Sequence, residues 1–514
     1  MKDTFFITTA IPYMNASAHI GHAYEMVLTD ILARYHRAQG KQVFFLTGTD
    51  EHGAKIVRTA TKAGKSPQAF VDEYAGEFRA LWDRFQISYD DFIRTSDKER
   101  HWKGAQALWE KLVAAGDLTK GIYKGLYCVG CEAFVTEKEL VDGKCQYHNV
   151  PPEEVEEENY FFDLARYAPQ IREAIDRGEL AIIPEGKKAE VFEMLTNATQ
   201  DVSFSRPEGD IPWGVPVPGD PSQMMYVWCD ALANYLSAPG YGTDEARFGR
   251  VWPPDVQVVG KDIARFHAVI WPAMLLAAGL ALPKTLLVHG FITSGGKKMS
   301  KSIGNVIDPV EYLDAYGVEA VRFYFAREIP STEDGDFTKE KFIASYNGNL
   351  SNGVGNLVSR TVKMATQYFE GDVARTPETD VPVRTAAGTM SGAEKREGWT
   401  IPYLIEHEIL PAYHKAMEAL EVHRGTEAAL RLAALLDEYI ADHEPFKLVK
   451  TDPEKTKIIL ANVLYGITHV ARMMQPIIPE TAGKIFATIG AKDDTLTHFS
   501  VTALDAPLYP RHDA

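Results

Sequence analysis

The stretch Phe5-Phe-Ile-Thr-Thr-Ala10, which leads through a loop of small and polar residues to His19-Ile-Gly-His22, decides the fold of this chain. Its first six residues favour a β-strand, and Pro12 cannot continue a ladder of hydrogen bonds. From Ala23 onward the apolar residues recur at helical spacing, at Val27, Leu28, Ile31, Leu32 and Tyr35. The stretch therefore predicts a strand, a loop and a helix.

Strands and helices continue to alternate after this unit. Val43-Phe-Phe-Leu-Thr47 predicts a second strand, and residues 67–85 have a second helical pattern. Further strand-like runs occur at Val256-Gln-Val-Val259 and Leu286-Leu-Val288. Because this alternation is typical of βαβ units, we expect an α/β fold with a parallel, Rossmann-like sheet.

Two parts of the chain depart from this pattern. Residues 119–225 are rich in Gly, Cys, Pro and Glu and contain few long helical patterns. They are interpreted as an insertion that splits the sheet domain into residues 1–118 and 226–290. Residues 291–342 include a loop rich in glycine and lysine, and residues 343–514 show apolar positions at i, i+3 and i+4, which predict an α-helical bundle.

The overall composition narrows the classes of protein. The 514 residues carry 54 Lys and Arg against 71 Asp and Glu, a net charge of −17, which argues against indiscriminate binding to nucleic acid but not against a specific partner. The apolar stretch Ala268–Pro283 is shorter than the roughly 20 residues that span a bilayer. We expect neither a membrane partner nor a secretory leader. Three of the four cysteines lie between positions 128 and 145, which indicates metal binding in a reducing cytoplasm.

Four groups of polar side chains follow the four predicted strands in turn: His19 with His22, Asp50 with His52, Lys261 with Asp262, and Lys297 with Lys298 and Lys301. Ligands of open α/β sheets bind outside the carboxyl ends of the strands, so we expect all four groups to face one site. The histidine pair begins a helix, and Gly21 leaves room for a flat group, which favours nucleotide phosphates. The lysine loop could supply cations to a transferring phosphate. Capping histidines and a solvated loop are the alternatives.

The cysteines form a third pattern, Cys128-x2-Cys131-x13-Cys145-x2-His148. Two short chelating pairs separated by a loop suit one tetrahedral Zn²⁺. Four protein ligands close the coordination sphere, so the zinc is predicted to be structural rather than catalytic. Reduced core cysteines beside a surface histidine are the alternative.

The histidine pair and the lysine loop belong to His19-Ile-Gly-His22 and Lys298-Met-Ser-Lys-Ser302. Together these two motifs resemble, letter for letter, the HIGH and KMSKS signatures of class I aminoacyl-tRNA synthetases. From residue 5 to about 505 the chain is similar to bacterial methionyl-tRNA synthetases in particular. The segments that carry this resemblance are Ala10–Asn15, Thr47–Gly53, Tyr226–Leu232, Gly260–His267, His289–Phe291 and Asn356–Arg360.

The resemblance implies that methionine and ATP, the latter with Mg²⁺, form methionyl-adenylate, from which methionine passes to the terminal ribose of tRNA(Met). It implies catalytic roles for His19, His22, Lys298 and Lys301. The implied ATP site comprises these residues except Lys298, together with Gly21, Lys261, Asp262, His289 and Gly290. The implied methionine site comprises Ile11, Tyr13, Asp50, Trp228, Ala231, Leu232, Tyr235, Ile263 and His267. Without the resemblance, Trp228 and Tyr235 would be interpreted as ordinary core residues.

The helical bundle, by the same resemblance, binds the anticodon of initiator and elongator tRNA through Asn356 and Arg360. The family usually has a Pro-Trp pair later in the bundle, whereas this chain has Pro445-Phe446, and Phe446 can stack on a base without an indole N–H. Cys229 replaces a larger hydrophobe and is interpreted as a small buried residue. Nothing after about residue 505 resembles an additional tRNA-binding or dimerising domain, so a monomer is expected.

Three other classes of protein were weighed against this interpretation. A cysteinyl enzyme would need a thiol-selecting zinc in its active site, whereas the cysteine cluster here lies in the insertion. Small nucleotidyltransferases lack an anticodon bundle. A non-catalytic tRNA-binding relative would have degenerate motifs, and both motifs are intact.

Overall fold

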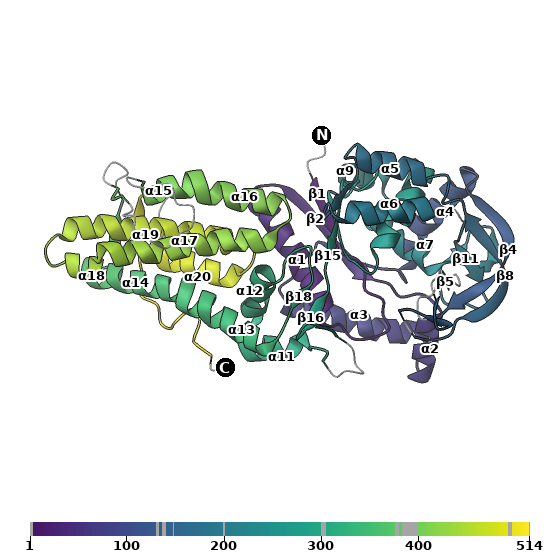
Figure 1. Cartoon of the computed structure of the whole chain (residues 1–514), viewed down its shortest axis with the longest axis horizontal. Coiled ribbons are helices and arrows are strands. Elements are labelled where there is room, and N and C mark those ends of the chain that lie inside the picture. The colour runs from purple at the N-terminus through teal and green to yellow at the C-terminus, as the bar shows by residue number, and fades with distance from the viewer. Residues whose placement is uncertain are drawn as a thin grey trace. The chain divides into compact units, whose positions relative to one another are not determined.

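The computed structural model describes residues 4–129, 133–135, 140–147, 149–198, 201–299, 305–375, 380–382, 399–491 and 496–512. The chain forms two compact units, Met1–Gly290 and Phe291–Ala514 (Figure 1). The first contains one main sheet together with helices and smaller sheets, and the second is mostly helical (Figure 1).

The first unit is built on six parallel strands in the order β3-β2-β1-β14-β15-β9. Phe6, Ile7, Phe45 and Leu46 are completely buried, as is typical of central strands that are covered on both faces. The predicted parallel sheet is confirmed. The strands are β1 (Thr4–Thr8), β2 (Gln42–Thr49), β3 (Asp91–Arg94), β9 (Ala181–Ile183), β14 (Val256–Gly260) and β15 (Thr285–His289).

Helices connect and cover these strands. Helix α3 begins where the Ser66 hydroxyl accepts a hydrogen bond from the Ala69 amide and Pro67 occupies the first turn, so the helix predicted over residues 67–85 is confirmed. The helices of this unit outside the insertion are α1 (Ile20–Ala38), α2 (Ala54–Lys62), α3 (Pro67–Arg84), α4 (Lys103–Ala114), α7 (Val227–Leu232), α8 (Asn234–Ser237), α9 (Glu245–Val251) and α10 (Trp271–Ala277), with π-helical turns η1 (Lys98–Trp102) and η3 (Phe266–Ile270).

The segment interpreted as an insertion contains two small antiparallel sheets of its own. One has the order β10-β8-β4-β5 and the other β11-β13-β12, and β6 and β7 form a separate hairpin. Their bounds, with those of two helices, are β4 (Leu118–Cys128), β5 (Ala133–Val135), β6 (Leu140–Val141), β7 (Lys144–Cys145), β8 (Glu153–Phe162), α5 (Ala168–Asp176), α6 (Lys187–Asn197), β10 (Val202–Ser203), β11 (Ser205–Pro207), β12 (Pro216–Val217) and β13 (Asp220–Met225).

One expectation about this segment was wrong. Residues 119–225 were expected to contain no strand of the main sheet, yet β9 pairs in parallel with β15 and forms the edge of that sheet. The run Ala181–Ile183 is too short for a periodic pattern to reveal it. The short strand β3 was missed for the same reason.

The second unit begins with a small sheet, β17-β16-β18, and continues as helices. The helical pattern predicted from residue 343 is confirmed for the described residues. The elements are β16 (Ile292–Ser294), β17 (Lys297–Lys298), α11 (Pro309–Tyr316), α12 (Val318–Glu328), β18 (Gly335–Asp336), α13 (Lys339–Ser345), η4 (Tyr346–Gly355), α14 (Asn356–Phe369), β19 (Asp372–Ala374), α15 (Ile401–Leu404), η6 (Ile405–Ile409), α16 (Leu410–Glu418), α17 (Val422–His443), α18 (Pro445–Leu448), α19 (Pro453–Met474), α20 (Pro479–Ile489) and β20 (His498–Ser500).

None of the helices formed by the described residues combines the length and the apolar character needed to cross a lipid bilayer.

Candidate active site

The order of strands reverses between β1 and β14, because the chain runs from β1 to β2 and β3 on one side and adds β14 and β15 on the other. At such a switch point the segments after neighbouring strands diverge, and ligands bind there. The segments that follow β1, β2, β14 and β15 therefore form the candidate active site.

His19 and His22 stand at the start of α1. The Nδ1 atom of His19 accepts a hydrogen bond from the Gly21 amide at 3.1 Å, and Nδ1 of His22 accepts one from the His19 amide at 3.3 Å. The two rings stack with centroids 3.8 Å apart. Because each Nδ1 is an acceptor, the proton of each neutral ring sits on Nε2, which can donate to an anion.

The surroundings of this pair fix both its geometry and its charge. A Cβ atom on Gly21 would come within 3.0 Å of the His19 ring, so a larger residue would displace that ring. Burial, together with the nearby His19 and His289, lowers the pKa of His22 to about 3, so its imidazole is neutral at neutral pH. Two neutral N–H donors at a helix N-terminus suit phosphate oxygens.

Asp50 lies beside the extension of β1. The Asp50 amide donates to the Pro12 carbonyl oxygen, and the Asp50 carbonyl oxygen accepts from the Met14 amide, both at 2.9 Å. Tyr13 and Asp50 thus form a short parallel bridge. Asp50 is 8% exposed, so its carboxylate is held in a largely dry position next to the segment that contains Ile11 and Tyr13.

An aromatic and apolar cluster stands on α7, α8 and η3. The Trp228 and Phe266 rings stack at 3.6 Å, and the Tyr235 hydroxyl lies 2.9 Å from Nε2 of His267. The other ring nitrogen of His267 lies 3.1 Å from the Ile263 carbonyl oxygen. Residues from the predicted methionine site that belong to or pack on this hydrophobic cluster are Ile11, Trp228, Leu232, Tyr235 and Ile263.

The pair formed by His267 and Tyr235 is uncharged. Burial lowers the pKa of His267 to about 4, although its hydrogen bond to the Ile263 backbone acts in the opposite direction. Burial also raises the pKa of Tyr235. Neutral His267 therefore donates a hydrogen bond from Nδ1 and accepts one from the Tyr235 hydroxyl at Nε2. The lone pairs of the Tyr235 oxygen then point away from His267.

The ends of β14 and β15 are joined by backbone hydrogen bonding. The Lys261 amide donates to the His289 carbonyl oxygen at 3.2 Å. A Cβ on Gly260 would approach the Asp262 carboxylate to 2.7 Å, so a larger residue there would displace that side chain. His289 is buried, whereas Asp262 is exposed. Lys261, Asp262, His289 and Gly290 thus follow two neighbouring strands at the same edge of the sheet.

Glu25 is an acid in this region that the sequence analysis did not identify. Its carboxylate accepts from the Ala10 amide at 2.8 Å and lies 2.9 Å from Nε2 of His289. Burial alone would lower the pKa of His289, but the hydrogen bond and charge of Glu25 outweigh it and raise that pKa. Glu25 follows His22 by three residues on α1, so helical spacing was the signal available in the sequence.

The lysine loop starts from a tight hairpin in the second unit. Strands β16 and β17 pair across Gly295 and Gly296, whose φ angles are +61° and +71°. Asp336 accepts hydrogen bonds from the Gly296 amide at 2.8 Å and the Thr293 hydroxyl at 3.0 Å. The Lys298 side chain and Lys301 lie outside the described residues, so their predicted catalytic roles stay predictions.

Only part of the cysteine pattern is described. Cys128 ends β4 and Cys145 lies in β7, and both are buried thiols. The Asn149 amide donates to the Cys145 carbonyl oxygen at 2.8 Å, which closes a turn after Cys145. Cys131 and His148 lie outside the described residues, and within those residues no group of three potential ligands gathers around a metal position.

The residues expected to read the anticodon are exposed. Asn356 and Arg360 lie one turn apart on α14, and Arg360 makes a 3.3 Å contact with Asp437. Phe446 on α18 is 41% exposed, so it is not a core residue. Cys229, by contrast, is buried as expected.

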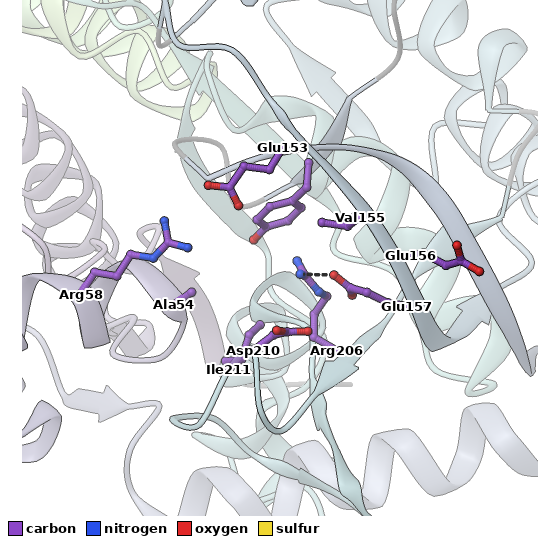
Figure 2. A pocket seen from close by; sticks show the side chains of 10 residues that line it. Ala54, Arg58, Glu153, Val155, Glu156, Glu157, Arg206, Asp210 and Ile211 are labelled. Atoms are coloured by element: carbon purple, nitrogen blue, oxygen red, sulfur yellow. Dashed lines mark hydrogen bonds and ion pairs between the residues drawn. The ribbon is translucent and has the colours of Figure 1, made fainter.

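A polar pocket lies elsewhere in the first unit. Figure 2 shows Arg58 of α2 facing a group of acidic side chains, with Arg206 and Glu157 forming a buried ion pair. The pocket is lined by Ala54, Arg58, Tyr127, Glu153, Val155, Glu156, Glu157, Arg206, Asp210 and Ile211. None of these residues is expected to bind methionine or ATP.

The chain is similar to known proteins over almost its whole length. The model of the family "tRNA synthetases class I (M)" matches residues 5–152 and 135–362, and that of the "Anticodon binding domain of methionyl tRNA ligase" matches residues 391–509. The methionine–tRNA ligase of Rhizobium meliloti is 39% identical over 538 residues, which cover 100% of this chain and 99% of the relative. That of Thermotoga maritima is also 39% identical, with 95% and 76% covered.

The chain belongs to the methionyl-tRNA synthetase family. A solved methionyl-tRNA synthetase from Mycobacterium tuberculosis, in complex with methionyl-adenylate, matches with a TM-score of 0.89 and 34% identity over 99% of this chain and 100% of that one. The sequence-based resemblance to methionyl-tRNA synthetases, and with it the Rossmann-like catalytic domain followed by a helical anticodon-binding domain, is confirmed.

Proposed function

We propose that the carboxyl edge of the main sheet activates L-methionine with ATP, forming methionyl-adenylate and pyrophosphate, and that methionine then passes to the 3′-terminal ribose of tRNA(Met). Membership in a family of methionine–tRNA ligases supports this activity. The observation in this chain that carries the proposal is the neutral pair of Tyr235 and His267 beside the stacked Trp228, in the same unit as Asp50.

This arrangement suits methionine at both of its ends. A thioether is apolar and polarizable, so aromatic walls attract it. The Tyr235 hydroxyl beside it is uncharged, so the thioether does not lie next to an ion. The carboxylate of Asp50 would pair with the substrate ammonium in a dry position, where a charge-assisted hydrogen bond is strong. Ile11, Tyr13, Ala231, Leu232, Ile263 and His267 complete the proposed site.

The proposed reaction needs no protein nucleophile. A carboxylate oxygen of methionine attacks the α-phosphorus in line, and the bond from that phosphorus to the oxygen bridging the β-phosphate breaks, releasing pyrophosphate. The Nε2–H groups of His19 and His22 would donate to phosphate oxygens, with ATP lying on Gly21. Catalysis then consists of positioning and charge stabilisation. Lys261, Asp262, His289, Gly290, Lys298 and Lys301 are proposed to complete the ATP site.

Two metal ions are part of the proposal. Mg²⁺ would arrive with ATP, bound mainly by its phosphates. One structural Zn²⁺ would be held by Cys128 and Cys145 together with Cys131 and His148. Buried thiols at the end of β4 and at a closed turn after β7 suit that ion, because zinc binds thiolates in compact loops.

The helical unit would bind the anticodon of initiator and elongator tRNA(Met) through Asn356, Arg360 and Phe446. Exposed polar and aromatic side chains are what unstacked bases require. We further propose a cytoplasmic monomer. The domain limits expected from the sequence, at residues 118, 225, 290 and 342, stay predictions.

One assay tests this function, namely amino-acid-dependent exchange of pyrophosphate into ATP, run with each of the 20 amino acids. Methionine alone should support rapid exchange, and tRNA(Met) should then be charged. Exchange with cysteine in place of methionine would identify a cysteinyl enzyme. A folded protein that exchanges pyrophosphate with no amino acid would contradict the proposal altogether.

A further inference from the structure

The first unit contains a buried chain of polar side chains, none of which is assigned above to the ATP site or the methionine site. Nδ1 of His52 lies 2.6 Å from one carboxylate oxygen of Asp230, and Nε2 of His101 lies 2.6 Å from the other. Nδ1 of His101 lies 3.0 Å from the Ser237 hydroxyl. None of the four side chains is more than 1% exposed. We call these four residues the Asp230 ladder.

The carboxylate at its centre is ionised. Burial alone would raise the pKa of Asp230, but the charges and hydrogen bonds of His52 and His101 lower it to about 2. Each carboxylate oxygen therefore accepts an imidazole N–H. A buried carboxylate is costly unless it is fully paired, so loss of either imidazole contact leaves a strongly unfavourable group behind. The ladder thus has one favoured geometry.

The ladder joins two segments that hold opposite ends of the proposed substrate. His52 follows β2, two residues after Asp50, the proposed partner of the ammonium group. Asp230 lies in α7, the helix that also contains Trp228, Ala231 and Leu232 of the proposed side-chain pocket. His101 adds the η1 turn as a third anchor.

The segment between Asp50 and His52 has little freedom to absorb a shift. Glu51 is completely buried, and its carboxylate accepts from Nε and Nη2 of Arg94 at 2.7 and 2.9 Å. Its amide donates to the Thr95 hydroxyl at 2.8 Å. Because Glu51 cannot absorb a shift, a displacement of His52 would strain the backbone of Asp50, which is itself bonded to Pro12.

Both ends of the Asp230 ladder, Ser237 and His52, are closely packed. A Cβ on Gly104 would lie 2.5 Å from the Cβ of Ser237, so α4 and α8 meet at a glycine. The His52 ring stands edge-on to Trp213, with centroids 5.3 Å apart, and the Trp213 indole donates to the Glu51 carbonyl oxygen at 2.6 Å. Neither α8 nor the segment after β2 can move without disturbing these contacts.

We propose that Asp230 is a positioning residue that sets the separation between Asp50 and the side-chain pocket of α7, and so selects the length of the amino acid side chain. The proposal rests on the proposed function of those two sites. A difference of one methylene changes kcat/KM by only about 10- to 200-fold, and that discrimination is realised only where the two ends of the site are held at a fixed distance.

The test measures amino acid activation by the full chain carrying Asp230→Asn, or Asp230→Glu, which keeps the charge but moves it by one methylene. The substrates are methionine, the shorter homocysteine, the longer ethionine, and norleucine, which has the length of methionine without sulfur. We expect kcat/KM for methionine to fall at least 10-fold, mainly through KM, with KM for ATP unchanged within 2-fold.

The decisive quantity is the ratio of kcat/KM between substrates. The preference for methionine over ethionine and homocysteine should fall at least 5-fold in both variants, whereas the preference over norleucine should change less than 2-fold. If both length-dependent ratios equal those of the unaltered chain, Asp230 does not position the site. A lower thermal stability with unchanged ratios would assign it a structural role only and equally overturn the proposal.

Glu157→Gln is the matched control, because Glu157 is also a buried carboxylate in an ion pair, with Arg206, in a different part of the unit (Figure 2). It should lose stability but keep every substrate ratio. If the Asp230 variants do not fold, His101→Gln, whose amide can still donate to Asp230, and Ser237→Ala, which removes only the hydroxyl beyond His101, must show a smaller loss of length selection. An unaltered chain that fails to activate methionine would instead contradict the proposed function.

Discussion

Asp50 is the residue on which recognition of the substrate ammonium is expected to depend. Its carboxylate is nearly buried and its backbone is fixed by Pro12 and Met14. Replacement of Asp50 by Asn keeps the shape but removes the charge, which costs about 2 kcal/mol in a charge-assisted hydrogen bond, or roughly 30-fold in affinity. We expect KM for methionine to rise by about that factor in pyrophosphate exchange, with KM for ATP within 2-fold.

Asp176→Asn provides the comparison for this variant. Asp176 ends helix α5, where its side chain is half exposed and pairs with Lys188 at 3.2 Å. It should leave both Michaelis constants unchanged. If Asp50→Asn retains the normal KM for methionine, another group binds the ammonium.

For single residues, the sequence predicted which side chains matter, but not their protonation or their hydrogen-bond partners. The positions of His19 and His22 followed from a motif, but the donor at Nε2 follows only from the backbone amides that occupy each Nδ1. Asp230 lies in the segment Tyr226–Leu232, but no role could be predicted for it. Its partners His52 and His101 are 178 and 129 residues away in the chain.

The hairpin of β16 and β17 is the element from which the lysine loop emerges, and Asp336 holds its turn. The Lys341 ammonium lies 2.7 Å from the second Asp336 oxygen, so the carboxylate links the turn to α13. Asp336→Ala should release the Gly296 amide and lower kcat for adenylate formation at least 10-fold, because the loop then leaves its base in varied directions. KM for methionine should change less than 2-fold, as measured by pyrophosphate exchange.

Lys339→Ala on the same helix is the control, since Lys339 is exposed and takes no part in the turn. It should retain full kcat. Equal losses in the two variants would mean that α13 as a whole, rather than the hydrogen bonds of Asp336, determines the rate.

Helix α18 carries the exposed Phe446. A change at this residue should affect recognition of tRNA and leave activation of methionine unchanged. Because stacking of a base on an aromatic ring is worth about 1–3 kcal/mol, Phe446→Ala should reduce kcat/KM for charging of tRNA(Met) by about 5-fold or more. Pyrophosphate exchange should stay normal. A parallel loss in both assays would place the effect in the folding of the helical unit. Phe446→Trp should charge tRNA at least as well as the unaltered chain.

At the scale of elements, long periodic segments were predictable and short ones were not. Helix α3 was placed within a residue of its observed end because its apolar residues recur at helical spacing along its length. Strand β9 has three residues and no alternation to detect, and its place depends on pairing with β15, about 100 residues later. Local patterns do not contain that information.

Among the residues that the structure describes, several buried histidines have lowered pKa values and His289 has a raised one. Burial lowers the pKa of His36, His267 and His469 to about 4, well below the ordinary value near 6.5. Between those values the unfolded chain binds more protons than the folded chain, so stability is lost as pH falls. His289 has a raised pKa and acts in the opposite direction, since its contribution is lost as pH rises.

Because the lowered pKa values outnumber the raised one in this group, acid should destabilise the protein well before its carboxylates are protonated. Each histidine contributes at most about 1.4 kcal/mol for each pH unit below 6.5. We expect the thermal midpoint to fall by several degrees between pH 7 and pH 5, measured by circular dichroism at constant ionic strength. The variant His469→Gln removes one of these groups and should make the decline shallower. A midpoint that stays constant over this range would show that the buried imidazoles take up protons in the folded state.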